Sequence, residues 1–267
     1  KNYGFGPIPF GNPTLSFATQ APFHMGFYHE PSIMYKAAPF LKRTYPLLRV
    51  HQYTSLARLA FDTGHPYWGW RFTGLALHYV QDLTQPYHAS LAPGHSTLSL
   101  LATNLLAMLG RTKGKEELIV LLSNRHLALE KYQAETLWAA STTGQSDHPM
   151  LRALRDTAED ARYPSWSDLY VRDVVAAQAK AYANTLDAIV VAAMPSQYVT
   201  DPAYDFGEHE ASITLRETLQ KADPAKTRPL DNSIAELLGH FGAHSRNAIR
   251  GILKAGGMPP VLQQGKP

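Results

Sequence analysis

The sequence predicts an all-α protein with a single domain. Three observations predict this fold class. After about residue 45, apolar residues recur at the spacing of amphipathic helices, Gly and Pro mark the ends of these segments, and no segment alternates as a strand does. A length of 267 residues allows one large core. We therefore expect one domain over 1–267, with a loop-rich segment at 1–44 and a helical core at 45–255.

Gly and Pro residues divide the helical core into eight expected helices. The segment 66–82 is apolar on almost every side, which is typical of a central, buried helix, and 98–109 has the same character. Pro66 suits the first turn of its helix, and Ser165 or Ser167 is expected to cap another. The expected helices cover 46–62, 66–82, 98–109, 116–140, 150–161, 165–194, 208–222 and 232–254.

The composition excludes several classes of function. With Cys 0, the chain has no disulfide, no cysteine nucleophile and no thiolate metal site. A net charge of +3 is too small to indicate a nucleic-acid-binding protein, and the longest apolar stretches are shorter than a membrane span. The chain opens without a signal peptide. We expect that one has been removed and that the protein is secreted, periplasmic or attached to the outer surface.

The segment 78–88 carries the strongest indication of chemistry. His78 and Asp82 are four residues apart, so they share one face of a helix that is otherwise too apolar to face water. A buried imidazole beside a buried carboxylate needs a hydrogen bond or a cation. Pro86 ends the helix, and His88 follows from the turn. Imidazole and carboxylate without thiols favour zinc in a hydrolytic site. A hydrogen-bonded His–Asp pair in the core is the alternative.

A second pair, His126 and Glu130, has the same spacing within the expected helix 116–140. The three residues between them are apolar, so this face can enter the same core. Alone, such a pair is typical of an ion pair on the protein surface. Together with the first segment, it indicates further metal ligands.

These residues resemble a known family. The sequence LALHYVQDLTQPYH, residues 75–88, resembles the central His-x-x-x-Asp-x-x-x-Pro-x-His motif of zinc-dependent bacterial phospholipases C and the related fungal single-strand-specific nucleases. The stretch 55–74 is similar to the same region of the alpha-toxin type enzymes. Residues 124–126 together with Glu130 look like a later metal-binding pair of the family. The resemblance extends over roughly residues 45–130.

The resemblance implies an all-helical fold around two or three zinc ions. His78 would bind one ion, and Asp82 would bridge it to a second. The ligands implied for a further ion are His88, His126 and Glu130. Water activated at these ions would hydrolyse a phosphodiester, with Asp82 as the catalytic residue that positions the water.

The family takes one more histidine ligand from a loop upstream of the central helix, and the matching region here is 22–31. We favour His24 for this role, with His29 second. Family members also begin with a tryptophan and carry an aspartate before this loop. Here no tryptophan precedes His24, and no acidic residue precedes Glu30.

The remaining ligand-type residues have simpler interpretations. His240 and His244 share a helix face but lack a third ligand, so we expect them to be core or surface residues. Asp205, Glu208 and His209 are expected at a helix N-terminus, where acidic residues are favourable. The histidines expected to be structural or solvent-exposed are His51, His65, His95 and His148.

Phospholipid is the expected substrate, and a single-strand-specific nuclease is the alternative. The absence of disulfides and the amino-acid sequence of residues 84–88 favour the phospholipase over the nuclease. Aromatic side chains near the site suit a choline-like cation or a stacked base, although core packing is the simpler explanation. Those expected to bind substrate are Phe27, Tyr28, Tyr79 and Tyr87. A third interpretation is a non-catalytic helical protein that binds lipid or a partner. Any membrane contact is expected to be peripheral, through residues 3–17.

Overall fold

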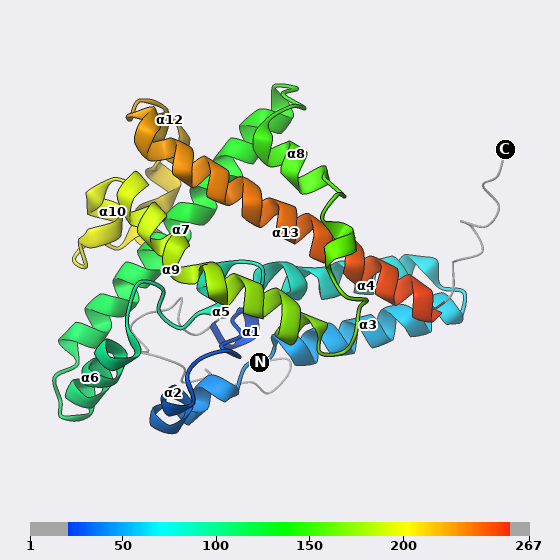
Figure 1. Ribbon diagram of the computed structural model, residues 1–267, viewed down its shortest axis with the longest axis horizontal. Helices are drawn as coiled ribbons and strands as arrows, with labels where there is room; N and C mark the ends of the chain where they lie inside the picture. Colours follow the sequence, from blue (N-terminus) through cyan, green and yellow to red (C-terminus); the bar gives the residue numbers. More distant parts are fainter. Residues whose placement is uncertain (1–20, 257–267) are drawn as a thin grey trace.

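The computed structural model describes residues 21–256, and all regular structure within this range is helical (Figure 1). The all-α fold class is confirmed. The elements are α1 (Ala21–His24), α2 (Ser32–Ala37), η2 (Pro39–Lys42), α3 (Pro46–Asp62), α4 (Pro66–Asp82), α5 (Pro86–Ala89), α6 (Thr97–Met108), α7 (Lys113–Thr142), α8 (Pro149–Arg155), η3 (Asp160–Arg162), η4 (Val171–Ala176), α9 (Ala177–Ala193), α10 (Ser196–Thr200), α11 (Phe206–His209), η5 (Glu210–Ser212), α12 (Leu215–Gln220) and α13 (Pro224–Gly256).

Helices α3 and α4 have the predicted bounds and pack against each other as an antiparallel hairpin (Figure 1). The buried stripe of α3 includes Val50, Thr54, Ala57 and Phe61. The buried stripe of α4 is Gly69, Thr73, Ala76 and Val80. Both stripes follow the spacing that places residues on one helix face. Small residues in α4 allow a close approach, and Gly64 makes the turn between the helices at a φ of 76°, which favours glycine.

Two helices that the sequence predicts to be buried have exposed apolar faces. The prediction for 66–82 was wrong because α4 packs through its narrow stripe of small residues, which leaves Tyr67, Trp68 and Trp70 exposed. The prediction for 98–109 was also wrong, since none of the residues of α6 is fully buried. Its exposed apolar residues, with Leu109 just beyond its end, are Leu98, Leu105, Leu106 and Met108.

The long helix α13 joins the α3–α4 hairpin to the rest of the molecule. It packs against α3, α4, α8 and α9 (Figure 1). It begins earlier than predicted, at Pro224, because the Asp223 side chain caps it by accepting a hydrogen bond from the Ala225 amide at 2.9 Å. The largest buried cluster includes residues of α7, α9 and α13 such as Leu129, Leu186 and Ile234.

The predicted helix 165–194 begins later than expected. It becomes helical as η4 at Val171, so neither serine at its start is an N-cap. Tertiary packing decides this start. The Trp166 side chain lies against Gly251 of α13, in the space that a Cβ at that glycine would occupy. The chain therefore approaches α13 before it turns into the helix.

The predicted helix 208–222 is divided into α11, η5 and α12. The Asp205 side chain caps α11 by accepting a hydrogen bond from the Gly207 amide at 2.9 Å. At the start of α12, the Arg216 amide donates to a carboxylate oxygen of Glu135 in α7 at 2.7 Å. Side chains outside the segment thus set where each short helix begins. The predicted helix 150–161 is likewise shorter, and only α8 and the single turn η3 are helical there.

The described part of the predicted loop-rich segment contains the short elements α1, α2 and η2. The predicted membrane contact through residues 3–17 lies outside the described residues. Among the described helices, none is both long enough and apolar enough to cross a bilayer.

The packing of α3 on α4 predicts opposite effects for two glycine substitutions in one helix. In Gly69→Ala the new Cβ would lie 2.4 Å from the Phe61 ring, which is itself buried and packed against Trp70. We expect this overpacking to lower the free energy of unfolding by about 1–3 kcal/mol. At Gly74, a Cβ would have no neighbouring heavy atom within 4 Å, so Gly74→Ala should raise it by about 0.5–1 kcal/mol. Urea denaturation measures both. A neutral Gly69→Ala variant would contradict the close packing.

Candidate metal centre

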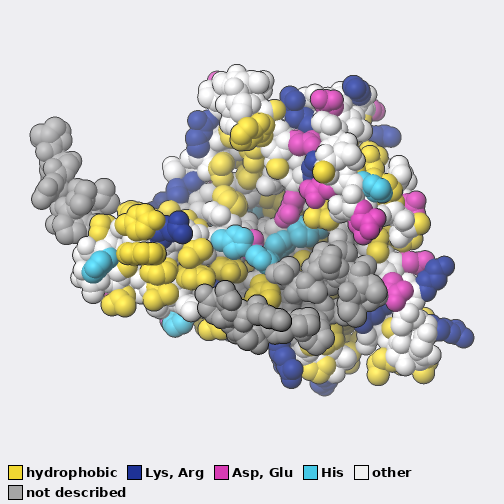
Figure 2. Space-filling model, turned by 180° about the vertical axis from the view of Figure 1, so that it is seen from behind, with side chains coloured by type: hydrophobic (Ala, Val, Ile, Leu, Met, Phe, Trp, Pro, Cys, Tyr) yellow, Lys and Arg dark blue, Asp and Glu magenta, His cyan; other side chains and the backbone are white. Residues whose placement is uncertain are grey.

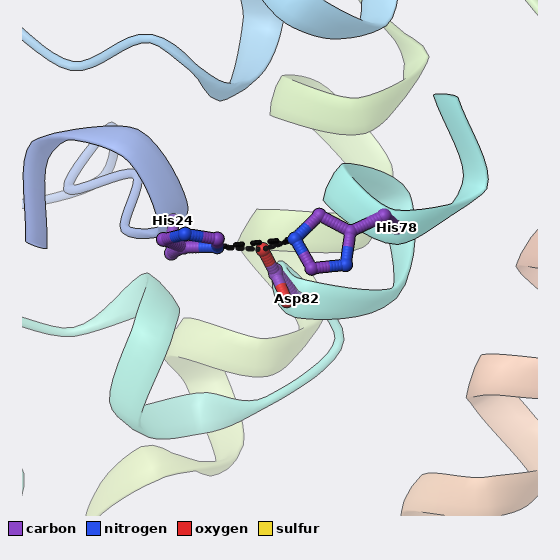
Figure 3. Close-up of side chains that lie close together, drawn as sticks. All are labelled: His24, His78 and Asp82. Atoms are coloured by element: carbon purple, nitrogen blue, oxygen red, sulfur yellow. Dashed lines mark hydrogen bonds and ion pairs between the residues drawn. The ribbon is translucent and has the colours of Figure 1, made fainter. Parts of the chain in front are cut away.

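The last turn of α4 and the end of α1 bring three ligand-type side chains together, and we call them the His24 triad: His24, His78 and Asp82 (Figure 3). The spacing of His78 and Asp82 on α4 places His78 Nε2 3.5 Å from Asp82 Oδ2. His24 approaches from the opposite side. Its Nδ1 atom lies 2.8 Å from Asp82 Oδ2 and 3.2 Å from His78 Nε2. The structure therefore unites the predicted pair with the favoured loop histidine.

The second group, the His88 triad, consists of His88, His126 and Glu130. His126 and Glu130 lie one turn apart on α7, with His126 Nε2 2.9 Å from Glu130 Oε1. His88 comes from α5, whose first turn is capped by Gln85. Its Nε2 atom lies 2.9 Å from His126 Nε2 and 3.7 Å from Glu130 Oε1. These are the three residues that the sequence predicts to share an ion.

The distances within each triad fit a small divalent cation. Ligands about 2.0–2.1 Å from a tetrahedral ion lie about 3.3–3.4 Å from one another. The six distances given above range from 2.8 to 3.7 Å and bracket that value. A tetrahedral ion held by the three side chains of one triad would keep a fourth position for another ligand.

A hydrogen bond to the backbone fixes which nitrogen of the His88 ring carries the proton. His88 Nδ1 lies 3.1 Å from the carbonyl oxygen of His24. A carbonyl oxygen can only accept, so Nδ1 carries the proton, and Nε2 presents its lone pair to the other two residues of the triad. The Gly26 amide in turn donates to the His88 carbonyl at 2.8 Å. Residues 24–26 therefore contact both triads, which lie next to each other.

The electrostatics of the His88 triad favour the protonation states that bind cations. Burial, reinforced by the neighbouring His126, lowers the pKa of His88 to about 3. Desolvation alone would raise the pKa of Glu130, but the hydrogen bond from His126 and the nearby imidazoles lower it to about 2. At neutral pH, His88 is therefore neutral and Glu130 is ionised. In the other triad, burial raises the pKa of Asp82 despite the hydrogen bond from His24.

A buried ion pair supports the His88 triad from behind. Arg125 and Asp187 have side chains only 11% and 6% exposed, and Arg125 donates to both Asp187 oxygens at 3.1 and 3.2 Å. Asp187 also accepts a hydrogen bond from the Tyr87 hydroxyl at 2.8 Å. The Tyr87 ring stacks on His126, with 5.8 Å between ring centroids and 16° between planes. Because Tyr87 precedes His88 and Arg125 precedes His126, the pair fixes the backbone beside two ligands.

The Arg125–Asp187 pair was not predicted from the sequence. Asp187 is the single acidic residue in the apolar segment 183–193, and Arg125 lies on the buried face of α7. An acidic and a basic residue that each stand alone on an apolar helix face need each other or another polar partner. The isolation of Asp187 and Arg125 could therefore have predicted the pair.

The four aromatic residues predicted to bind substrate have different environments. Tyr79 lies beside the His24 triad, with its ring centroid 4.9 Å from that of His78 and 6.0 Å from that of His24. Phe27 and Tyr87 are buried but border a large cavity next to the His88 triad. Tyr28 packs instead against the core cluster that contains Val80 and Tyr170, and its hydroxyl accepts a hydrogen bond from Thr44.

The other candidate histidines have partners away from the two triads. His29 Nε2 donates to the carbonyl oxygen of Arg172 at 2.7 Å. His244 is buried and hydrogen-bonds Tyr170 and Gln178, and Gln178 also contacts His240 at 3.1 Å, so this pair belongs to a polar network in the core. His148 accepts from the Met150 amide as a cap of α8, and His65 pairs with Thr63. The metal-ligand groups found among the described residues are the two triads.

Two cavities of different polarity meet at the triads. A cavity of about 980 Å³ with a mainly apolar wall reaches His24, His88, His126 and Glu130. A smaller cavity of about 210 Å³ borders His78, Asp82 and Glu130. Figure 2 shows the histidines gathered near the middle of one face, with acidic side chains close by. Glu130 borders both cavities, so the triads are accessible from a polar side and an apolar side.

The ion pair behind the His88 triad predicts a large loss of stability for Asp187→Ala. The substitution would leave the buried Arg125 guanidinium without its carboxylate, which typically costs about 3–5 kcal/mol. Urea denaturation measures the free energy of unfolding. Asp173→Ala is the matched control, since this acid pairs with Arg172 on the surface, and it should leave stability unchanged within error. A loss below about 1 kcal/mol for Asp187→Ala would show that the pair is not buried as described.

Comparisons with known proteins do not place the chain in a family. No protein-family model, no curated protein and no solved structure matches it. Two groups of residues that could hold metal ions are therefore what the structure establishes about the site.

Proposed function

We propose that this protein is a zinc-dependent phosphodiester hydrolase of the phospholipase C type, which cleaves the glycerol–phosphate bond of phospholipids. The observation that carries the proposal is the placement of two adjacent triads of imidazole and carboxylate side chains at the border of a large, mainly apolar cavity. The resemblance of residues 75–88 to the family motif supports the same function.

The ligand set supports zinc over other ions. Each triad offers two imidazole nitrogens and one carboxylate oxygen. Imidazole suits zinc and other transition metals, whereas calcium and magnesium prefer sites made of oxygen ligands. Zinc bound there would lower the pKa of a coordinated water and stabilise the charge that develops on a phosphate during hydrolysis. Two adjacent triads agree with the two or three ions that the sequence motif implies.

The residues around the polar cavity have distinct roles in this proposal. Asp82 lies where the His24 triad borders the cavity and would orient the attacking water as a hydrogen-bond acceptor. The side-chain amides of Gln85 and Gln133 also border this cavity, and Gln85 hydrogen-bonds Glu130. An amide can donate to a non-bridging phosphate oxygen. The chain itself thus supplies one group for the water and two for the phosphate.

Lipid is favoured over nucleic acid by the apolar surroundings of the site. The larger cavity is lined mainly by aliphatic and aromatic side chains, which suit an acyl chain better than a sugar–phosphate backbone. Exposed hydrophobic side chains also gather over the α3–α4 end of the face that carries the histidines (Figure 2). Tyr67, Trp68 and Trp70 of α4 are exposed, and such residues favour the membrane interface. A peripheral contact with lipid and a location outside the cytoplasm complete the proposal.

Removal of the metal and of single ligands tests the hydrolase. Chelation should abolish hydrolysis of a soluble p-nitrophenyl phosphodiester, and added zinc should restore it. Glu130→Gln and Asp82→Asn should each reduce the rate by at least about 100-fold, since metal-ion catalysis supplies several kcal/mol. His29→Gln, which changes an exposed histidine outside both triads, should keep full activity and full zinc content by mass spectrometry. Full activity after exhaustive chelation, or a protein without bound zinc, would rule the proposal out.

The choice of substrate separates the phospholipase from the nuclease. Phosphatidylcholine in mixed micelles should release phosphocholine, which a phosphate assay after phosphatase treatment quantifies. Single-stranded DNA under the same conditions should stay intact on a denaturing gel. Rapid digestion of DNA with no release of phosphocholine would favour the nuclease on the same metal centre.

A further inference from the structure

The larger cavity has an unusual distribution of polarity. Its wall is built from α2, η2, α6, α7 and the segments beside His24 and His88. Most of the side chains that form it are apolar, among them Met34, Leu41, Leu91, Leu101, Ile119 and Leu122. The three residues of the His88 triad also border it. The cavity is therefore suited to a molecule with one polar end and a long apolar part.

Helix α6 contributes apolar side chains to this wall that the residues described by the structure leave partly uncovered. Its sequence predicts a buried helix, yet none of its residues is fully buried. Leu100, Leu101, Ala107 and Met108 border the cavity. Apolar side chains that face open space lose the free energy that burial would give, about 25 cal/mol per Å². A ligand chain in the cavity would recover this free energy, and apolar cavities do bind apolar ligands.

The size of the cavity also fits such a ligand. Its volume of about 980 Å³ lies near the upper end of the range of ligand-binding cavities. The His88 triad is specific in its chemistry, because two imidazoles and one carboxylate attract an anionic group only through a bound cation. A phosphate ester is an anion that such a cation holds.

We propose that this cavity binds the long alkyl or acyl chain of an amphipathic phosphate ester whose phosphate lies at the His88 triad. The inference rests on the proposed function for the identity of the head group. Binding of the chain does not itself require hydrolysis. In this proposal, α6 and the side of α7 that faces it recognise the alkyl or acyl chain of the ligand.

Chain-length dependence of binding tests the inference. The probes are alkylphosphocholines of increasing chain length, each below its micelle concentration, titrated into the zinc-loaded protein by calorimetry. Each added methylene that enters the cavity should lower Kd about fourfold, until the cavity is filled. An alkanoate of equal chain length should bind more weakly, and equal or tighter binding would overturn the assignment of a phosphate to the polar end.

Two alanines on α6 provide a matched pair of variants. Ala107 borders the cavity, whereas Ala102 is exposed and does not border it. Ala107→Trp should fill part of the cavity and weaken binding of the longest probe by at least 10-fold, with the chain-length dependence flattened. Ala102→Trp should bind every probe as the unmodified protein does. Thr103→Asp, which adds a charge to the wall without removing an apolar side chain, serves if Ala107→Trp fails to fold, and should weaken the same probe.

The outcomes separate this inference from the proposed function. Hydrolysis of a short soluble phosphodiester, together with equal binding of long and short chains, would support the proposed hydrolase function and overturn the proposed cavity site. Chain-length-dependent binding that Ala107→Trp and Thr103→Asp leave unchanged would also overturn it. A protein without hydrolysis that still shows the predicted dependence would support the cavity site and count against the hydrolase alone.

Discussion

Hydrogen bonds between the backbone near His24 and residue His88 hold the two triads together. His88 donates to the His24 carbonyl, and the Gly26 amide donates to the His88 carbonyl. Both α1 and α5 have only four residues, too few for a helix that is stable in isolation. Each therefore depends on the other and on the long helices α4 and α7 beside them. Gly26 packs closely beside this junction, and a Cβ there would displace the Tyr28 ring.

The buried pair of Arg125 and Asp187 sets the position of α7 relative to α9. A buried ion pair contributes little net stability, but removing either partner is costly, so it disfavours arrangements that separate the two. Asp187 also lies against Gly94, where a Cβ would be 2.2 Å from its Oδ2 atom. The carboxylate of Asp187, on α9, thus contacts both α7 and the loop after α5. Ligands that come from α5 and α7 can then meet at fixed distances.

The sequence predicted what depends on helical spacing and missed what depends on packing. The pairs on α4 and α7 follow from four-residue spacing alone, and His24 from its place in the motif region. The helix bounds were wrong at 165–194 and 208–222, where Trp166 and Glu135 set the starts through contacts with distant elements. The apolar composition of α6 predicted burial, but composition does not distinguish a protein neighbour from a cavity. The contact of the two triads likewise depends on backbone hydrogen bonds that no spacing reveals.

The side chains of the two triads differ in their exposure to solvent. The His78 side chain is 51% exposed and that of Glu130 45%, whereas that of His88 is only 10% exposed. Water therefore reaches the site from the small polar cavity, which His78, Asp82 and Glu130 border. The larger cavity has a mainly apolar wall, which offers water fewer hydrogen-bond partners. In the proposed reaction, the attacking water would enter from the small polar cavity and the apolar part of the substrate would occupy the larger one. An in-line displacement at phosphorus requires the leaving alcohol, which remains attached to the apolar part, to lie away from the water that replaces it. Separate cavities for the two would meet this requirement.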